Sequence, residues 1–245
     1  TPGRKGVVLP EREIDIPLAT MFSETMLRTK KARLPEVSEL DTMRHYITLS
    51  HKNHFIEKGL YPLGSCTMKY NPKLHETLVR HPSFTSLHPY QPEETLQGAL
   101  ELMYELQKDL AEIAGMAGVT LQPAAGAQGE FTGIKIIAAY HKVKGNTHKD
   151  TIIIPDSAHG TNPASCSLVG YKTVELASNK EGRCDIAKLR ELVNDQTAGI
   201  MITNPNTLGL FETQIEEIAD IIHSVDALMY MDGANLNALL GIVQP

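Results

Sequence analysis

A histidine and an aspartate that each follow an apolar run are the residues of this sequence best suited to chemistry. His159 follows the β-branched run 151–154 within a segment of small residues, and Asp232 closes the apolar run 227–231. An imidazole can take up or release a proton near neutral pH. A carboxylate at the end of an apolar strand is costly to bury alone, so we expect a cation or a hydrogen-bond donor beside Asp232. A surface histidine and an aspartate that caps the next turn are the simpler alternatives.

Two further segments offer an anion-binding helix start and an amide. Gly126, Ala127 and Gln128 precede a helical stretch, and small residues at a helix start leave free N–H groups for an anion. The segment lacks the GxGxxG pattern and a P-loop lysine, which disfavours a dinucleotide or a nucleoside triphosphate. Asn204 follows the run 199–203 and presents an amide suited to a hydroxyl or a carboxylate. Ordinary turn chemistry is the alternative interpretation of both segments.

Alternating strands and helices would position these four segments. We predict short strands at 119–121, 151–154, 171–176, 199–203 and 227–231. We predict helices at 93–115, 130–142, 162–169, 185–194 and 215–224, with Gly115 ending the first. This alternation indicates an α/β fold with a mostly parallel sheet and flanking helices. Ligands of such sheets bind beyond the carboxyl ends of the strands, where all four segments would meet.

The amino-terminal part is predicted to be an arm. Residues 1–35 carry four prolines and little periodicity, and a helix is predicted to begin after Ser38. We expect residues 1–50 to pack on a partner subunit and residues 51–245 to form a large domain. Within that domain, residues 59–72 are rich in glycine, proline and small polar groups, which indicates an irregular loop.

Composition excludes several classes of protein. The chain has 245 residues, of which 42% are hydrophobic, 21% charged and 5% aromatic, with no tryptophan and a net charge of −6. These values argue against a disordered chain, a base-stacking platform and a basic nucleic-acid-binding surface. No apolar run approaches the roughly 18 residues of a membrane span.

The three cysteines predict neither a disulfide framework nor a metal site. Cys66, Cys166 and Cys184 are odd in number, widely separated and without zinc-ligand spacing. We expect them to be reduced in a cytoplasmic protein. The first 17 residues hold no apolar signal core, and acidic residues interrupt any transit-peptide pattern.

The four strand-end segments, in this chain order, resemble pyridoxal phosphate enzymes with the aspartate aminotransferase-like fold, also called fold type I. The resemblance implies that residues 126–128 hold the cofactor phosphate and that His159 lies over the pyridine ring. It implies that Asn204 meets the ring oxygen and that Ala234 packs on the ring face opposite His159. It also implies that Asp232 keeps the ring nitrogen protonated, so that the ring can act as an electron sink.

Longer segments narrow the resemblance to the P-protein of the glycine cleavage system. They are GLYPLGSCTMKYNP (59–72), HPYQPEE (88–94), AGAQGE (125–130), PDSAHGTNPAS (155–165) and MDGANLNA (231–238). The resemblance implies decarboxylation of glycine and transfer of the aminomethyl group to the lipoyl arm of the H-protein, with His159 and Asp232 catalytic. The opening 2–11 resembles the cofactor-bearing second subunit of the two-subunit prokaryotic form. That form implies a heterotetramer with subunit 1 and the cytoplasm rather than the mitochondrial matrix.

Residues Ser65, Cys66 and Thr67 lie in the polar loop and are expected to line the entrance for substrate or lipoyl arm. A covalent role for Cys66 is a weaker alternative, because no base that would orient it is identifiable.

The family's Schiff-base lysine follows the strand-end aspartate by a few tens of residues, whereas residues 233–245 contain no lysine. We therefore expect this chain to be a truncated piece of the subunit that is inactive alone.

Two other functions stay open at this point. A different fold-type-I lyase or a desulfurase would need a mobile reactive cysteine or arginines for a substrate carboxylate, and no arginine lies in these strand-end segments. A non-catalytic paired subunit would be expected to lack the cofactor residues, and the retained His159 and Asp232 argue against it.

Overall fold

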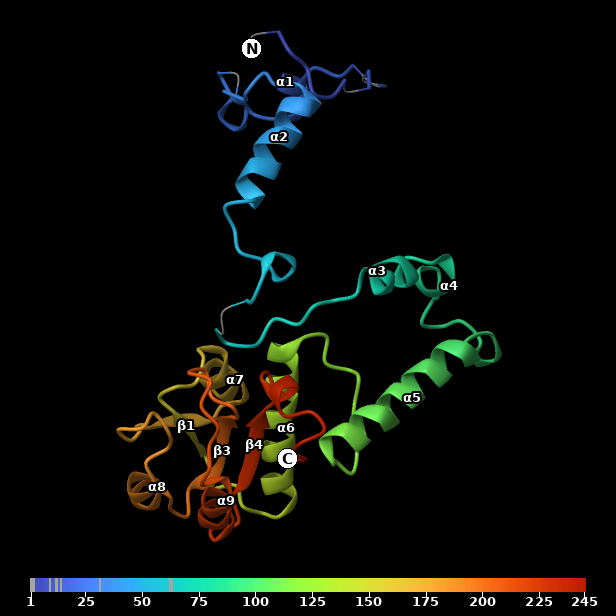
Figure 1. Ribbon diagram of the computed structural model, residues 1–245. Coiled ribbons are helices and arrows are strands. Elements are labelled where there is room, and N and C mark those ends of the chain that lie inside the picture. Colours follow the sequence, from blue (N-terminus) through green and yellow to red (C-terminus); the bar gives the residue numbers. More distant parts are fainter. Residues whose placement is uncertain (1–2, 9, 12, 14, 31, 62–63) are drawn as a thin grey trace. The chain divides into compact units, whose positions relative to one another are not determined.

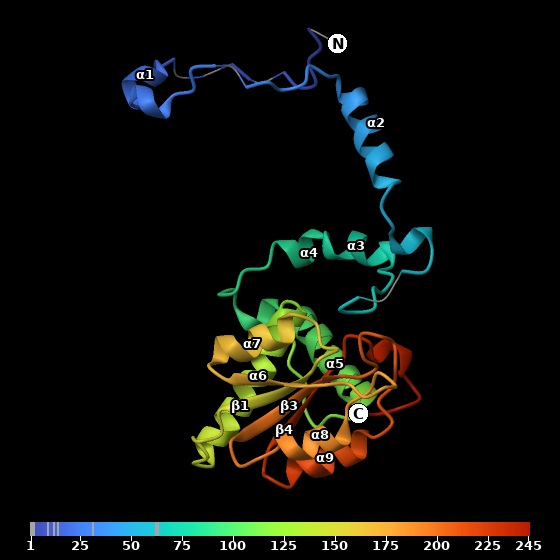
Figure 2. The ribbon, with the colours of Figure 1, turned by 90° about the vertical axis from the view of Figure 1, so that its left-hand side faces the viewer.

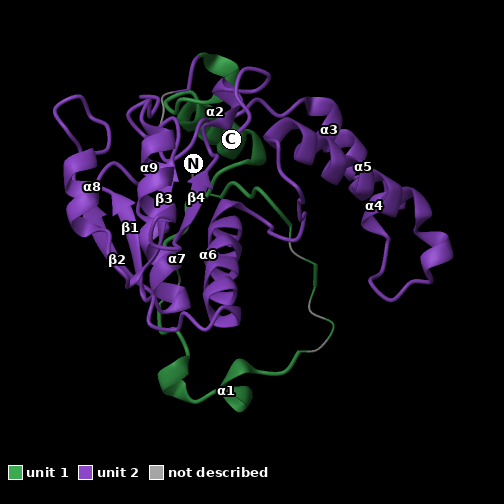
Figure 3. Ribbon diagram, turned by 90° about the horizontal axis from the view of Figure 1, so that it is seen from below, with its two compact units in different colours: residues 1–59 green, residues 60–245 purple. Residues whose placement is uncertain are grey.

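A computed structural model describes residues 3–8, 10–11, 13, 15–30, 32–61 and 64–245. The chain forms two compact units, Thr1–Gly59 and Leu60–Pro245, which Figure 3 colours separately. The predicted division after residue 50 coincides with the end of a helix, and the first unit continues to Gly59. Packing of residues 1–50 on a partner subunit stays a prediction.

The first unit consists of short helices joined by extended segments. Its elements are α1 (Leu18–Met21), η1 (Glu24–Met26), α2 (Glu39–Ser50) and η2 (Ile56–Lys58). Ser38 caps α2, as predicted, because its hydroxyl oxygen accepts from the Asp41 N–H at 3.1 Å. None of these four elements buries a residue. The unit therefore holds no hydrophobic core within its helices.

The second unit contains a four-stranded parallel sheet, which confirms the predicted α/β fold (Figure 1). Its strands are β1 (Thr151–Pro155), β2 (Lys172–Leu176), β3 (Thr197–Thr203) and β4 (Leu228–Asp232). They pair in the order β2-β1-β3-β4, and every pairing is parallel. All seven residues of β3 are buried, as expected for an inner strand covered on both faces. Four of the five predicted strands are thus present at their predicted places.

Helices cover both faces of the sheet. Helices α6 (Gly126–Val143) and α7 (Thr161–Val169) lie on one face, and α8 (Ile186–Leu192) and α9 (Ile215–His223) lie together on the other (Figure 2). Strand side chains alternate between the two faces, so Ile152 and Ile154 join the cluster under α6 and α7. Ile153 points the other way, into the cluster under α8 and α9. The sheet is therefore the middle layer of three.

The remaining elements of this unit are α3 (Lys73–Val79), α4 (Pro82–Thr85), η3 (Glu93–Thr95), α5 (Gln97–Ala114) and η4 (Leu236–Ala238). Helix α5 ends, as predicted, at Gly115, whose φ of 65° lies in the left-handed region. No helix in the described ranges is both long and apolar enough to cross a membrane.

Two predictions around the start of α6 were wrong, one about a strand and one about the first residue of the helix. Residues 119–121 form no strand, and the Val119 carbonyl accepts from the side-chain amide of Gln107 instead of joining the sheet. A strand requires a neighbouring backbone with which to pair. Helix α6 begins at Gly126, four residues before the predicted start, because Ala125 is the last extended residue. The small residues 126–129 therefore form the first turn of the helix itself.

We predict that the close approach of β3 and β4 requires glycine at position 199. A Cβ atom at Gly199 would lie 2.6 Å from the backbone oxygen of Leu228. Gly199→Ala should therefore lower the free energy of unfolding by about 1–3 kcal/mol, measured by urea unfolding with circular dichroism.

Gly98→Ala in α5 is the matched control, because a Cβ there meets nothing within 4 Å. Alanine favours helix more than glycine does, so this variant should be as stable as the parent or slightly more stable. Equal stability of the two variants would contradict the packing argument.

Candidate active site

A cavity of about 360 Å³ lies beyond the carboxyl end of β4 and beside the start of α6. Its volume is within the range of about 300–1,000 Å³ that is usual for small-molecule sites. Segments far apart in the sequence line it, namely Ser65, Cys66, Gly126, Ala127, Gly129, Glu130, His159, Thr161, Tyr230, Asp232, Gly233 and Ala234. The structure thus brings together three of the four segments singled out in the sequence.

Asp232 is buried at the end of β4 and surrounded by hydrogen-bond donors. Its Oδ2 accepts from His159 Nε2 at 2.9 Å and from Asn162 Nδ2 at 3.2 Å. Its Oδ1 accepts from the Ala234 N–H at 2.9 Å. These three donors offset the cost of burying the carboxylate, whose residue is 6% exposed. The predicted need for a donor beside Asp232 is confirmed.

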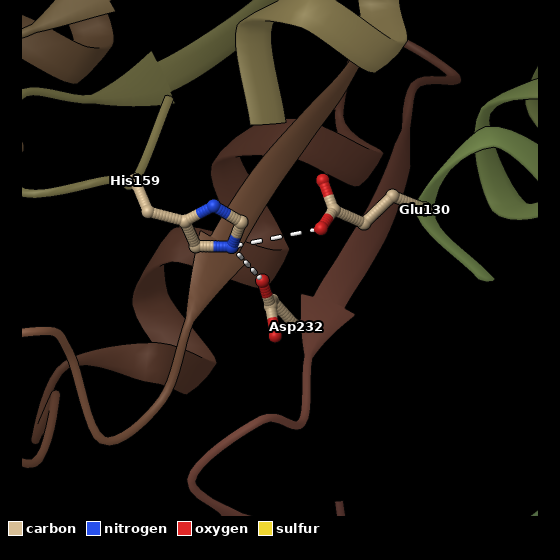
Figure 4. Close-up of side chains that lie close together, drawn as sticks. All are labelled: Glu130, His159 and Asp232. Carbon is tan, nitrogen blue, oxygen red and sulfur yellow. Dashed lines mark hydrogen bonds and ion pairs between the residues drawn. The ribbon is translucent and has the colours of Figure 1, made fainter. Parts of the chain in front are cut away.

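The hydrogen bonds of His159 define which ring nitrogen carries the proton. Its Nδ1 accepts from the Thr161 N–H at 3.3 Å, while its Nε2 faces the Asp232 carboxylate (Figure 4). A carboxylate can only accept, so the proton of the neutral ring lies on Nε2. His159 therefore presents an N–H group to Asp232 at the cavity wall.

Glu130 is a second buried acid in this site, and the sequence analysis assigned it no role. It extends from α6 toward the same histidine (Figure 4), with Oε1 at 3.6 Å from His159 Nε2. Its Oε2 accepts from Asn162 Nδ2 at 3.0 Å. Burial raises the pKa of the Glu130 carboxyl, and the charge of Asp232 raises it further. Helical spacing in the sequence could have indicated that Glu130 is buried, because Glu130 lies on the same face of the helix as Ile134 and Ile137.

The start of α6 leaves room for a ligand. Gly126, Ala127 and Gly129 line the cavity, and the N-cap residue Ala125 makes no side-chain capping hydrogen bond. A Cβ atom at Gly126 or Gly129 would meet nothing within 4 Å, so side chains there would project into open space. Gln128 is exposed and is not among the residues that line the cavity. The turn thus combines open space with the N–H groups of a helix start.

Asn204 lies outside the lining of this cavity. Its side chain is buried, and its Oδ1 accepts from the Glu212 N–H at 3.0 Å. The Asn204 side chain therefore holds the turn that leads from β3 toward α9. The amide nitrogen is the donor that a contact with a ring oxygen would require.

The loop predicted to line the entrance is attached to the end of β4. Ser65 and Cys66 line the cavity. Thr67 does not, but its N–H donates to Asn235 Oδ1 at 3.0 Å and its hydroxyl to the Ala234 carbonyl at 3.1 Å. The Nζ of Lys69 also donates to the Ala234 carbonyl. Thr67 and Lys69 therefore hold the segment that carries the two lining residues.

The acid–histidine cluster also has the donor types of a metal site. One ligating atom each of Glu130, His159 and Asp232 lies within 4.8 Å of the others. Imidazole and carboxylate are common metal ligands. The Asn162 amide, however, already donates to both carboxylates, which suits hydrogen-bonded acids rather than metal ligands. The absence of a metal stays a prediction.

Comparison with known proteins gives a family match over most of the chain. The model of the family described as "Glycine cleavage system P-protein" matches residues 13–245. A protein of Halalkalibacterium halodurans, named "Probable glycine dehydrogenase (decarboxylating) subunit 2", is 56% identical over 245 residues. The match covers 100% of this chain and 50% of that protein. The chain thus spans about half the length of the curated relatives it matches.

Solved structures show the same fold. A crystal structure of glycine decarboxylase (P-protein) of the glycine cleavage system, in inhibitor-bound form, has a TM-score of 0.62 and 23% identity. The match covers 87% of this chain and 47% of that one. A structure of Oryza sativa TDC with PLP and tryptamine has a TM-score of 0.58 and 13% identity, covering 85% of this chain and 50% of that one. The predicted fold-type-I architecture is confirmed.

We predict that Cys66 is the reactive thiol among the three cysteines of this chain. Burial raises the pKa of the Cys166 thiol to about 11 and that of the Cys184 thiol to about 12, so both stay protonated. Cys66 is partly exposed at the cavity. Iodoacetamide should label Cys66 in the folded protein and all three in urea, as mapped by peptide mass spectrometry. Equal labelling of Cys166 or Cys184 in the folded protein would contradict this.

We predict a pH-dependent stability difference between the parent protein and Glu130→Gln. The folded state holds the Glu130 proton more tightly than the unfolded state, because the pKa is raised above its ordinary value of 4.5. The parent therefore loses stability as the pH rises from below that value through the raised pKa, and the glutamine variant lacks this loss. Urea unfolding should show that the free energy of unfolding of the variant rises relative to that of the parent as the pH increases from about 4 to about 7. A difference in the free energy of unfolding that does not change with pH would contradict a raised pKa of Glu130 in the folded protein.

Proposed function

This chain belongs to the glycine cleavage system P-protein family, and from that premise we propose that its protein decarboxylates glycine with pyridoxal 5′-phosphate. The remaining aminomethyl group passes to the lipoyl arm of the H-protein. One observation carries the proposal: a buried carboxylate, a histidine N–H and an open helix start meet at one cavity at the strand ends.

The cavity fits the parts of this cofactor. The open first turn of α6, at Gly126 and Ala127, suits a phosphate group. Asp232 offers a carboxylate for the ring nitrogen, and the three donors around it hold that carboxylate in place. His159 and Ala234 both line the cavity and would flank the ring. Asn204 lies outside the lining of this cavity, so its proposed contact with the ring oxygen, through the amide nitrogen, rests on the family resemblance.

The residues of this chain would hold charge and protons for the reaction. When bound, the cofactor supplies an electron sink for the pair of electrons left as the carboxylate departs as CO₂. Asp232 holds a negative charge where water is largely excluded, and a charge there stabilises a protonated nitrogen more than it would in bulk water. His159 carries a proton at Nε2 and donates it to the Asp232 carboxylate as a hydrogen bond.

The buried acids disfavour a non-catalytic role for this subunit. Glu130 and Asp232 are each 6% exposed, and burying two carboxylates costs more free energy than packing apolar side chains of similar size. A purely structural subunit would gain nothing from that cost. A related lyase for another amino acid is disfavoured by the 56% identity to a protein named for glycine.

We infer further partners from the family. The relatives are named as subunit 2, which supports a partner subunit 1. We propose that the two subunits form a heterotetramer in a prokaryotic cytoplasm. Helix α2 exposes large apolar side chains that a partner subunit would cover, namely Leu40, Met43, Tyr46, Ile47 and Leu49. Glycine and the lipoyl arm would enter past Ser65 and Cys66.

We predict that Asp232→Ala in the complete protein abolishes glycine-dependent exchange of CO₂. Loss of the charge beside the ring nitrogen should slow exchange by about 100-fold or more, because preorganised charges of this kind contribute that much. The assay combines the complete protein, its partner subunit and H-protein with labelled bicarbonate. Asp220→Ala, the same change on the exposed side of α9, should exchange at the parent rate. Exchange near the parent rate in Asp232→Ala would refute the proposed function.

A further inference from the structure

One amide group joins the two buried acids of the site. The Nδ2 atom of Asn162 donates to Glu130 Oε2 at 3.0 Å and to Asp232 Oδ2 at 3.2 Å. An amide nitrogen carries two hydrogens, so each carboxylate receives one. Asn162 is 1% exposed, which leaves its side chain little freedom to find other partners. Its orientation is therefore set by both acids at once.

Packing alone does not explain Glu130. Its position on α6 belongs to a buried stripe whose next members are isoleucines, and an apolar residue there would avoid the cost of burying a carboxyl. Among the described residues, the only basic side chain within ion-pair distance of Glu130 is His159, at 3.6 Å. Glu130 instead accepts from Asn162 and, at 3.5 Å, from the hydroxyl of Ser165. Both of these donors belong to α7, which also presents Asn162 to Asp232.

We propose that Glu130 is a positioning residue for Asp232 and acts through the Asn162 amide. The inference rests on the proposed function, because it concerns the carboxylate assigned to the cofactor nitrogen. Glu130 anchors one hydrogen of the amide, so that the other stays directed at Asp232 Oδ2. Together with the His159 N–H, that hydrogen bond fixes the plane of the Asp232 carboxylate. Without Glu130, Asn162 could turn away and Asp232 would lose one of its three donors.

Two ligands separate this role from general support of the fold. One is pyridoxal 5′-phosphate, and the other is its analogue with the ring nitrogen replaced by carbon. Both carry the same aldehyde and phosphate, so the ratio of their affinities reports the contact with the ring nitrogen. The ratio is measured by absorbance titration of the cofactor-free complete protein with its partner subunit.

Glu130→Ala should weaken binding of pyridoxal 5′-phosphate by about tenfold, as residues that orient a first contact commonly do. Binding of the analogue should change by less than about twofold, because it makes no contact that Asp232 must orient. Glu130→Gln keeps an oxygen that can accept from Asn162, and should restore affinity to within about threefold of the parent. Asn162→Ala should repeat the pattern of Glu130→Ala.

The double variant Glu130→Ala/Asp232→Ala should have the same ratio as Asp232→Ala alone, because the positioned group is already gone. Glu212→Ala is the control for loss of a buried glutamate. Glu212 is 4% exposed and lies outside the cavity, where it accepts from the Cys184 N–H. It should lower stability and leave the ratio unchanged.

Equal weakening of both ligands by Glu130→Ala, or a Glu130→Gln variant as weak as Glu130→Ala, would overturn the positioning role. In either case, the proposed function would stand if Asp232→Ala binds pyridoxal 5′-phosphate more weakly and the analogue as the parent does, because that change of the affinity ratio reports the contact with the ring nitrogen. A parent protein that does not bind pyridoxal 5′-phosphate, or an Asp232→Ala variant with the parent ratio, would overturn both. Binding of pyridoxal 5′-phosphate that requires an added metal ion in the parent, and that loses this requirement in Glu130→Ala, would assign Glu130, His159 and Asp232 to a cation and overturn the proposal.

Discussion

A carboxylate that is buried at the end of an apolar strand must be given hydrogen-bond donors, and the arrangement around Asp232 meets this constraint. The donors come from the turn that follows β4 and from the segment that begins α7. These elements can converge because parallel strands place their carboxyl ends at one edge of the sheet. The proton on His159 Nε2, the orientation of Asn162 and the path of the chain after β4 all follow from this one requirement.

Helices α6 and α7 share a polar contact inside an otherwise apolar layer. Ile134, Ile137 and Cys166 pack beneath them, while Glu130 and Asn162 meet at the end nearest the cavity. An unpaired polar group in such a layer would cost about 1–3 kcal/mol, and each of the two side chains supplies the other with a hydrogen-bond partner. The polar contact therefore specifies how the two helices lie against each other, in a way that apolar packing alone does not.

The sequence was most informative where a local pattern reflects burial on both faces of a sheet. Four apolar runs became strands, and the turn residues after them identified His159 and Asp232. The run 119–121 has the same apolar character, but it has no strand to pair with, which only the tertiary structure shows. Glu130 was not predicted because the anion-site pattern lies in the small residues before it, although its spacing to Ile134 already indicated burial. The inward turn of the Asn204 oxygen toward the Glu212 N–H depends on a loop conformation that no periodicity records.

One wall of the cavity is attached through Asn235, whose side chain contacts two loops. Its Oδ1 accepts from the Thr67 N–H across 168 residues of chain, and its Nδ2 donates to the Pro205 carbonyl at 2.8 Å. Closing so long a loop costs entropy that must be met before the contact gains any free energy. The strands of the sheet pair across much shorter stretches, so they can form without this wall. Because contacts between nearer segments cost less loop-closure entropy, we expect the sheet and its acids to form before the contact of Asn235 with Thr67 completes the entrance to the site.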